Sequence, residues 1–278
     1  MVAQELKSAG FKVYTAARRV DRMADLEKDG ITPVALDLTR DGSIAACVNT
    51  ILSKEKSIDV LVNNAGYGSY GAIEDVPLEE GRRQFEVNLF GIARLIRLVT
   101  PAMREQHYEK IVNISSMGGK IWTKFGGWYH ATKYAVEGLS DCLRMELQPF
   151  GIDVVVVEPG GIKTDWGLIA AENLKKTSTN GAYAEMANKA ADGMIKNYSG
   201  DLLSKPALIA KRSARPSPSA GPARAIWSGS AQSRWSGPTG SSATVCSTGP
   251  SGHSADAARR LAARTVFRYD RGQKEGFT

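Results

Sequence analysis

Short runs of Val, Ile and Leu alternate along most of the chain with longer segments whose apolar residues recur every three or four positions. The short runs lie at 12–15, 31–37, 59–64, 110–116 and 153–159, and the longer segments at 43–56, 78–106 and 127–150. A run that is apolar at nearly every position is typical of a parallel strand buried on both faces, and the longer segments are typical of connecting helices. With right-handed crossovers, the pattern predicts an α/β fold with one doubly wound parallel sheet.

Both ends of the chain depart from this alternation. Residues 1–10 predict a helix that ends at Gly10, directly before the run at 12–15. Between residues 211 and 254, Ile226 and Val245 are the only Leu, Ile, Val or Phe residues. Such a segment buries too little apolar surface to offset the entropy lost on ordering. We therefore predict a folded domain over 1–207 and a disordered, low-complexity basic tail over 208–278.

The net charge of +7 is concentrated in that tail. Residues 1–210 carry 25 Lys and Arg against 26 Asp and Glu, whereas 211–278 carry 11 against 3. The folded part has no excess positive field to attract a phosphate backbone, so no specific nucleic-acid partner is predicted. The alternative is weak, salt-sensitive attachment through the tail, in which Trp227 and Trp235 would stack on bases beside Arg224 and Arg234.

Several other classes of protein and site are disfavoured by the sequence. No apolar run approaches the roughly 18–20 residues of a membrane helix, and the first ten residues are charged rather than typical of a signal peptide, which predicts a cytoplasmic protein. Cysteine and histidine spacing predicts neither a disulfide framework nor a metal site. These residues are Cys47, Cys142, Cys246, His107, His130 and His253.

Tyr129 and Lys133 are four residues apart in the segment 127–150. On a helix this spacing places both side chains on one face, with the Lys133 ammonium beside the Tyr129 hydroxyl. A nearby ammonium favours the phenolate and lowers the pKa of a tyrosine from its usual value of about 10. The pair therefore predicts a general acid–base, and the alternative is a packed ring beside a solvated charge.

Two further polar residues belong to this candidate site. Ser116 stands at the carboxyl end of the run 110–116, where parallel sheets present catalytic groups, and its hydroxyl could stabilise charge on a substrate oxygen. Ser115 is the rival for that role, and both could be turn residues before Gly118. Asn88 lies among apolar neighbours within 78–106, where its amide either holds a water that links Lys133 to solvent or serves as a structural cap.

Four motifs occur in one order: NNAG at 63–66, SS at 115–116, Tyr-x-x-x-Lys at 129–133 and PGGIKT at 159–164. In this order and spacing, residues 10–205 resemble the short-chain dehydrogenase/reductase family. The resemblance implies a Rossmann-like enzyme that moves a hydride between a nicotinamide cofactor and a carbonyl or alcohol. It implies that Tyr129 donates the proton, Lys133 lowers its pKa and holds the nicotinamide ribose, Ser116 orients the substrate and Asn88 supports the proton relay.

The resemblance also implies cofactor contacts at residues that follow the predicted strands. The segment 64–66 would lie against the adenosine side, Asp37 would meet the adenine amino group, and the segment 159–164 would contact the nicotinamide carboxamide. The full expected set is Arg18, Asp37, Leu38, Asn64, Ala65, Gly66, Tyr129, Lys133, Pro159, Gly160, Ile162 and Thr164.

Charge after the run 12–15 predicts which nicotinamide cofactor binds. NAD enzymes usually offer an acid to the adenosine 2′-hydroxyl at this position, whereas NADP needs a cation for its 2′-phosphate. Here Ala17 is followed by Arg18 and Arg19, and no acidic residue lies between the run 12–15 and Asp21. Arginine grips phosphate with two parallel hydrogen bonds, so NADP is the predicted cofactor. The alternative is that both arginines are solvated loop residues.

The chain also departs from the family pattern. The family's first strand and glycine-rich turn do not precede the run 12–15. That strand would lie mid-sheet, so we expect the strands at 12–15 and 59–63 to lose a shared neighbour and NADP to bind weakly. A misplaced translation start or a fragment would explain this beginning, and out-of-frame translation would explain the tail. A non-catalytic regulatory or scaffold relative is the alternative to an enzyme.

Bulky side chains flank the candidate catalytic segments and predict a hydrophobic ketone, aldehyde or secondary alcohol as substrate. They are Trp122, Phe125, Trp128, Trp166, Leu168 and Ile169. Their alternative roles are in the core or in subunit contacts. The segments 78–106 and 127–150 resemble the helices that pair in family dimers and tetramers, so we expect a homo-oligomer.

Overall fold

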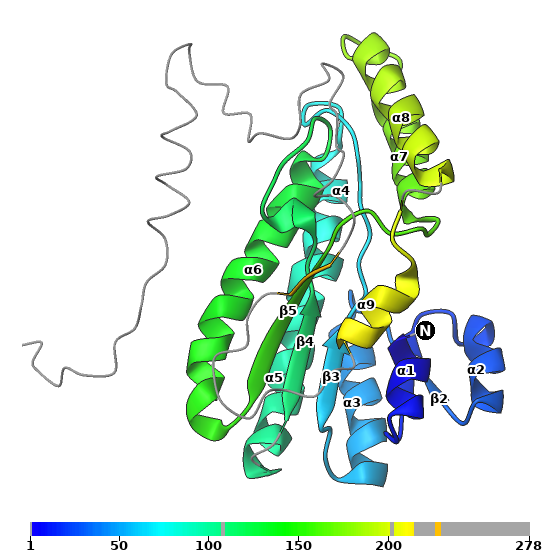
Figure 1. Cartoon of the computed structure of the whole chain (residues 1–278). Coiled ribbons are helices and arrows are strands. Elements are labelled where there is room, and N and C mark those ends of the chain that lie inside the picture. The colour runs from blue at the N-terminus through cyan, green and yellow to red at the C-terminus, as the bar shows by residue number, and fades with distance from the viewer. Residues whose placement is uncertain (1, 107–108, 201–202, 214–225, 229–278) are drawn as a thin grey trace, which may run out of the picture. The chain divides into compact units, whose positions relative to one another are not determined.

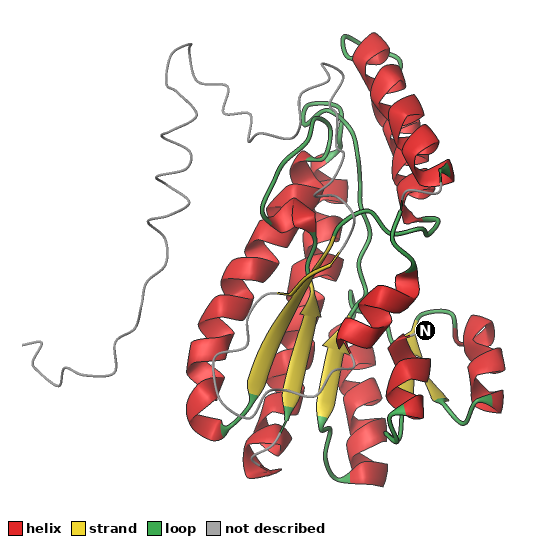
Figure 2. Ribbon diagram, viewed as in Figure 1, coloured by secondary structure: helices red, strands yellow, loops and turns green. Residues whose placement is uncertain are grey.

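The computed structural model describes residues 2–106, 109–200, 203–213 and 226–228. The chain divides into two units, Met1–Trp235 and Ser236–Thr278, and every described residue belongs to the first. Within this unit, strands and helices alternate along the chain (Figures 1 and 2). The expected domain boundary after residue 207 stays a prediction, and most of the expected tail lies outside the described residues.

The described strands form two parallel sheets. In the first, β1 (Tyr14–Ala17) pairs with β2 (Thr32–Ala35). The second sheet has the order β3-β4-β5-β6, and its members all run parallel. Their bounds are Val60–Asn63, Lys110–Ile114, Asp153–Pro159 and Ile226–Ser228.

Two expectations from the sequence are corrected here. A single sheet was expected, but the described strands form two. Because β1 and β3 stand in different sheets, the separate expectation that these strands lack a shared neighbour is confirmed. The tail from residue 208 was expected to be disordered, but residues 208–213 belong to the helix α9 (Pro206–Ser213), and residues 226–228 form β6. The edge of β5 offers unpaired backbone groups, and even a short segment can satisfy these by pairing with it.

Apolar side chains of β4 and β5 alternate between two cores. Ile111 and Val154 face a core built with α3 (Asp41–Glu55), α5 (Gly91–Gln106) and α6 (Gly127–Leu147). The opposite face carries Val112, Ile114, Val155 and Val157, which pack with Ile209 of α9 (Pro206–Ser213). Figure 1 shows α3 and α5 behind the strands and α9 in front of them. Burial on both faces explains why these strands are apolar at nearly every position.

A third, smaller core joins the first sheet to the second. It contains Leu6 of α1 (Val2–Ser8), Val13 and Ile31, with Leu26 of α2 (Ala24–Lys28) at its margin. Val62 of β3 packs against this core and against the core under α9. The two sheets are therefore joined through side chains at this point rather than through backbone hydrogen bonds.

The segment 78–106, expected as one helix, has three parts. It begins with α4 (Leu78–Phe85), continues as a π-helical turn over Glu86–Phe90, and ends with α5. Single π-helical turns occur often at functional sites. This turn contains Asn88, whose side chain is fully buried.

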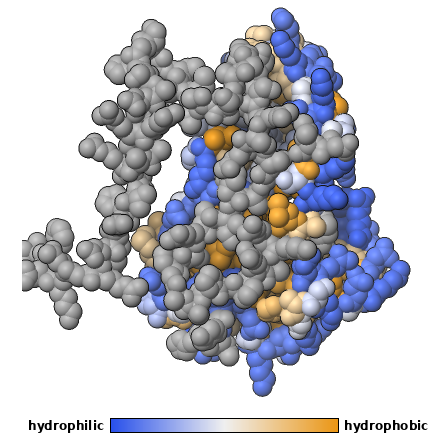
Figure 3. Space-filling model, viewed as in Figure 1, coloured by the Kyte–Doolittle hydropathy of each residue, from blue (hydrophilic) through white to orange (hydrophobic). Residues whose placement is uncertain are grey.

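A helical pair that the sequence pattern did not indicate follows β5. It consists of α7 (Trp166–Ser178) and α8 (Ala184–Ser199), which lie side by side (Figure 2). Gly167 permits the close approach, because a Cβ there would lie 2.3 Å from the Tyr198 ring. No described helix is both long and apolar enough to cross a membrane. On the face in Figure 3, the described surface is largely hydrophilic, with separate apolar patches.

Candidate active site

Tyr129 and Lys133 lie on consecutive turns of α6, as their spacing predicted. The Lys133 Nζ atom is 5.9 Å from the centre of the Tyr129 ring. It donates a 2.8 Å hydrogen bond to the carbonyl oxygen of Ile114, the last residue of β4. The exposed fractions of the two residues are only 7% and 6%. The helix therefore brings both side chains together at the carboxyl end of β4.

Burial determines the protonation of this pair. It raises the pKa of Tyr129, and a hydrogen bond with Ser116 opposes this. It lowers the pKa of Lys133 to about 8, and the nearby Glu137 carboxylate opposes this. The sequence argument expected the ammonium to lower the pKa of Tyr129, but in the structure burial has the larger effect. Tyr129 is thus a protonated phenol at neutral pH, which is the form that can donate a proton.

The structure separates the two adjacent serines. Ser116 hydrogen-bonds Tyr129, and its Oγ accepts a 3.0 Å hydrogen bond from the amide of Gly118 in the turn η3 (Met117–Gly119). Ser115 Oγ is buried, and no described group hydrogen-bonds it. Ser116 therefore shares a site with Tyr129, whereas Ser115 points elsewhere.

Asn88 holds the loop that follows β3. Its Oδ1 accepts a 3.1 Å hydrogen bond from the amide of Tyr67, and its Nδ2 donates to the Tyr67 carbonyl at 2.9 Å and to Thr132 Oγ1 at 3.1 Å. A Cβ on Gly66 would lie 3.2 Å from Asn88 Oδ1 and 3.9 Å from Lys133 Nζ. Asn88 thus fixes Gly66 beside Lys133, and its expected part in a proton relay stays a prediction.

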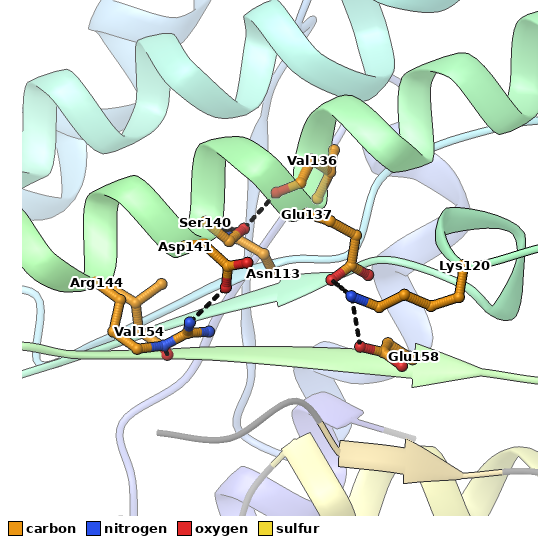
Figure 4. Close-up of polar contacts among 9 residues, drawn as sticks. All are labelled: Asn113, Lys120, Val136, Glu137, Ser140, Asp141, Arg144, Val154 and Glu158. Atoms are coloured by element: carbon orange, nitrogen blue, oxygen red, sulfur yellow. Dashed lines mark hydrogen bonds and ion pairs between the residues drawn. The ribbon is translucent and has the colours of Figure 1, made fainter. Parts of the chain in front are cut away.

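A buried polar network underlies the turn that carries Ser116 (Figure 4). The Lys120 ammonium lies 3.0 Å from a Glu137 carboxylate oxygen on α6 and 3.6 Å from one of Glu158 on β5. Burial raises the pKa of Glu158, as does the Glu137 charge, and Lys120 opposes both. Because Lys120 follows η3 directly, these two ion pairs hold the turn against α6 and β5.

Arg18 acts electrostatically on two of the segments that are expected to lie on the adenosine side of the cofactor. The charge of exposed Arg18 contributes to lowering the pKa of Asp37, although hydrogen bonds from Thr39 contribute most. Arg18 also opposes the burial that raises the pKa of Tyr67. Asp37 and Tyr67 follow different strands, so Arg18 acts on both segments. The Leu38 side chain belongs to the core, which leaves its backbone for any contact with a cofactor.

The remaining expected cofactor residues lie in two loops. Asn64, Ala65 and Gly66 are exposed after β3. After β5, Gly160 is half-buried, and Thr164 is exposed. Pro159 ends β5, and Ile162 forms a parallel bridge with Ser204. Both loops stand at the carboxyl ends of parallel strands of one sheet, on either side of β4, and open α/β sheets bind ligands at this edge.

Aromatic rings enclose the Tyr129 side chain. The Trp166 ring centre lies 5.0 Å from that of Tyr129, and the Tyr70 ring centre lies at 6.0 Å. Of the other bulky residues, Phe125 packs in the same cluster, whereas Trp128 packs on Phe85 of α4. Trp122 is 57% exposed, and Leu168 and Ile169 lie on α7.

The sequence argument missed Tyr70 and His130. Tyr70 lies in the glycine-rich stretch 66–71, where Gly68 and Gly71 indicate close packing but not which ring is packed. His130 was considered only as a metal ligand. The available signal was the pair of glycines nearby, Gly118 and Gly126, which indicates close packing but not which ring is packed.

The short chain dehydrogenase family model matches residues 1–174. The chain is 38% identical over 168 residues to the "probable short-chain type dehydrogenase/reductase VdlC" of Helicobacter pylori, which covers 60% of this chain and 62% of that protein. It is 37% identical over 186 residues to the 3-ketodihydrosphingosine reductase of Bacteroides thetaiotaomicron, covering 66% and 67%. The match thus spans less than two thirds of the Helicobacter protein.

A solved structure is also similar. It is a metagenomic short-chain oxidoreductase in complex with NADP, with a TM-score of 0.55 and 32% sequence identity. The match covers 59% of this chain and 77% of that chain.

Proposed function

Because the chain belongs to the short-chain dehydrogenase family, we propose that it transfers a hydride between NADP(H) and a hydrophobic carbonyl compound or secondary alcohol. The proposal rests mainly on one observation: Ser116, Tyr129 and Lys133 come together at the carboxyl end of β4. We also propose that Tyr129 is the proton donor to the substrate oxygen.

The proposed chemistry divides among these side chains. When bound, the nicotinamide would supply or accept the hydride. The protonated Tyr129 hydroxyl donates a proton to the carbonyl oxygen during reduction, and the Ser116 hydroxyl donates a hydrogen bond to the same oxygen. Lys133, with its pKa lowered to about 8, supplies positive charge beside the phenol and a donor for a ribose hydroxyl. Asn88 positions the loop 64–67 through its hydrogen bonds to Tyr67 and in this way supports the proposed proton relay.

The residues fit two parts of the proposed cofactor. Gly66 leaves space beside Asn88 and Lys133 where a Cβ would interfere, so backbone and cofactor could approach closely. Exposed Arg18 suits a 2′-phosphate, and the NADP complex of the similar metagenomic oxidoreductase supports this choice. The stretch before β1 contains one glycine, Gly10, and no glycine-rich turn for a pyrophosphate. The rest of the cofactor would be held by Asp37, Leu38, Asn64, Ala65, Tyr129, Lys133, Pro159, Gly160, Ile162 and Thr164.

The aromatic enclosure supports a hydrophobic substrate. Tyr70 and Trp166 pack directly on Tyr129, so a substrate oxygen that reaches the phenol must pass these rings. The similarity to a 3-ketodihydrosphingosine reductase is in line with a ketone that carries a long apolar group.

The test is NADPH oxidation with a panel of hydrophobic ketones and aldehydes. It uses the full chain and the same chain extended by an N-terminal strand and glycine-rich turn of the family type. We expect turnover in the extended protein, little in the chain as it stands, and loss on Tyr129→Phe. Tyr134→Phe is the matched control, because Tyr134 is exposed on the same helix. Equal turnover by Tyr129→Phe would overturn the mechanism.

A second candidate is a non-catalytic relative with a binding or scaffold role. The observation that favours it is the enclosure of Tyr129, which is 7% exposed beneath Trp166 and Tyr70. Turnover would exclude this candidate. Retained NADPH binding without turnover in the extended protein, for every carbonyl tested, would favour it.

We further propose a cytoplasmic homo-oligomer, a dimer or tetramer, with the folded domain at 1–207. Apolar side chains stand exposed on the segments that the family pairs, among them Phe90 of the π-helical turn, Leu98 of α5 and Met145 of α6. Such exposed apolar groups on adjacent helices support a contact between copies. The alternative partner, nucleic acid bound through the tail, rests on Trp227, which lies in β6, and on Arg224, Arg234 and Trp235, which lie outside the described residues.

A further inference from the structure

His130 follows Tyr129 on α6, and the proposed chemistry gives it no role. Its imidazole is buried between two glycines. A Cβ on Gly118 would lie 2.9 Å from the ring Nδ1, and a Cβ on Gly126 would lie 2.7 Å from Nε2. The glycines therefore allow backbone on both sides to reach the ring.

The two ring nitrogens contact backbone groups of opposite kind. Nδ1 lies 2.9 Å from the carbonyl oxygen of Gly118, which can only accept a hydrogen bond. Nε2 lies 3.1 Å from the amide nitrogen of Thr123, which can only donate. Nδ1 must therefore carry the proton, and Nε2 must accept. The geometry fixes His130 as a neutral imidazole with its proton on Nδ1.

These contacts lead to both sides of Tyr129. The Gly118 amide donates to Ser116 Oγ, so the His130 bond to Gly118 holds the turn that presents Ser116. The Thr123 hydroxyl lies 3.0 Å from Nε2, and it also hydrogen-bonds Tyr70. One imidazole thus connects the Ser116 turn with the aromatic ring that covers Tyr129.

We propose that His130 is a positioning residue: as a neutral Nδ1–H imidazole it holds the Ser116 turn and the Thr123–Tyr70 segment against α6. Protonation of Nε2 would place its N–H against the N–H of the Thr123 amide, so that two donors face each other. The Thr123–Tyr70 segment would then be released. The role in catalysis rests on the proposed function. The protonation state and the two hydrogen bonds stand independently of it.

The surroundings of His130 favour the neutral ring. Burial lowers its pKa, and the hydrogen bond to Gly118 opposes this. The titratable groups on the segments packed around it are Tyr129 of its own helix, Tyr70, and the loop residues Lys120 and Lys124. The Lys120 ammonium pairs with Glu137 and Glu158, and the Lys124 ammonium contacts the Met186 sulfur.

The first test measures the protonation state directly. The chain has three histidines, so His107→Gln with His253→Gln leaves His130 as the single imidazole of the full-length protein. We expect its ¹⁵N spectrum at pH 7 to show a protonated Nδ1 and an unprotonated Nε2. A proton on Nε2, or on both nitrogens at pH 7, would overturn the proposal.

The second test separates the two hydrogen bonds in the same background. His130→Asn keeps a donor near the Nδ1 position, and His130→Gln places an acceptor near Nε2. Hydrogen exchange of the Thr123 amide should accelerate roughly three- to tenfold in His130→Asn and little in His130→Gln. The Gly118 amide donates to Ser116 Oγ within the turn that the Nδ1 hydrogen bond holds, so its exchange should show the reverse order. The same order at both amides, or no change at either, would contradict the proposal.

The third test links the residue to turnover. In the extended protein, His130→Gln should lower kcat about tenfold or more with little change in the KM for NADPH, because it frees the Ser116 turn and leaves the cofactor contacts. A change in KM alone would contradict the positioning role. If the extended protein binds NADPH but never turns over, the proposed function fails, while the spectra and exchange rates still decide the state of His130.

Discussion

Two serines stand side by side at the end of β4, and their surroundings differ. Ser116 hydrogen-bonds Tyr129, whereas the Ser115 hydroxyl is buried without a described partner. We expect Ser116→Ala to lower kcat by about 10²–10³, the usual loss on removal of one donor to a developing oxyanion. NADPH oxidation by the extended protein measures this.

Ser115→Ala is the matched control for that change. It removes a buried hydroxyl that lacks a partner, so turnover should persist and the free energy of unfolding should stay equal or rise. A larger loss of kcat in Ser115→Ala than in Ser116→Ala would reverse the assignment of the two residues.

Lys133 carries a charge at a cost to stability. Burial lowers its pKa from 10.5 to about 8, so below pH 8 the folded state is penalised by about 3 kcal/mol, and this penalty vanishes as pH rises towards 10.5. Lys133→Met removes the charge and also the hydrogen bond to Ile114, worth about 1 kcal/mol. We expect the variant to be about 2 kcal/mol more stable than wild type at pH 7.

Urea unfolding at pH 7 and pH 10 measures this effect. The advantage of Lys133→Met should shrink at the higher pH, because the wild-type side chain is then largely neutral in the folded state. Equal differences at both pH values would show that burial of the charge is not the cause.

Residue types and spacing indicated the Tyr129–Lys133 pair, because four residues on a helix fix their relation. The pKa of Tyr129 could not be obtained in this way. It depends on burial by Tyr70 and Trp166, which come from distant parts of the sequence and meet Tyr129 only in the fold.

At the scale of elements, α7 packs on α8 through a glycine. A methyl group at Gly167 would lie within 2.3 Å of the Tyr198 ring, so Gly167→Ala should separate the two helices and lower the free energy of unfolding by about 1–3 kcal/mol. Thermal unfolding followed by circular dichroism measures this loss.

Gly193→Ala on α8 is the control for that substitution. Nothing lies within 4 Å of a Cβ at Gly193, so alanine should stabilise the helix by roughly 0.5–1 kcal/mol. Equal effects of the two substitutions would mean that contact with Tyr198 does not control the packing of α7.

The elements differed in how well sequence pattern predicted them. The strand expected at 153–159 matches β5, because both its faces are buried and nearly every position is apolar. The helix expected at 78–106 is interrupted by the π-helical turn, which periodicity does not reveal because the apolar spacing continues through it. The pair α7 and α8 packs through small residues such as Ala171 and Ala187, and these give little apolar signal.

At the scale of the whole molecule, exposed apolar residues on α6, on α5 and on the π-helical turn before α5 predict self-association. The double substitution Phe90→Glu and Met145→Glu should convert an oligomer to monomers, because it places charges on the proposed contact. Light scattering after size-exclusion chromatography measures the mass. Met186→Glu, at an exposed site on α8, is the control and should leave the mass unchanged.

The architecture followed from the alternation of strands and helices, but the number of sheets did not. Apolar runs identify strands without stating which strand pairs with which. The separation of β1 from β3 could be expected only from the family comparison.

That separation has a consequence for how the protein opens. Val62 joins the β2–α2 region to the core under α9, and Val34 of β2 packs against the largest core. The buried centre of the region itself consists of only three described side chains, Leu6, Val13 and Ile31. A cooperative unit this small should detach at a fraction of the global unfolding free energy, as a subglobal fluctuation. Amides of residues 14–35 should then exchange with deuterium well before those of β4 and β5. The part of the proposed cofactor site that contains Arg18 would therefore be the part that unfolds most often.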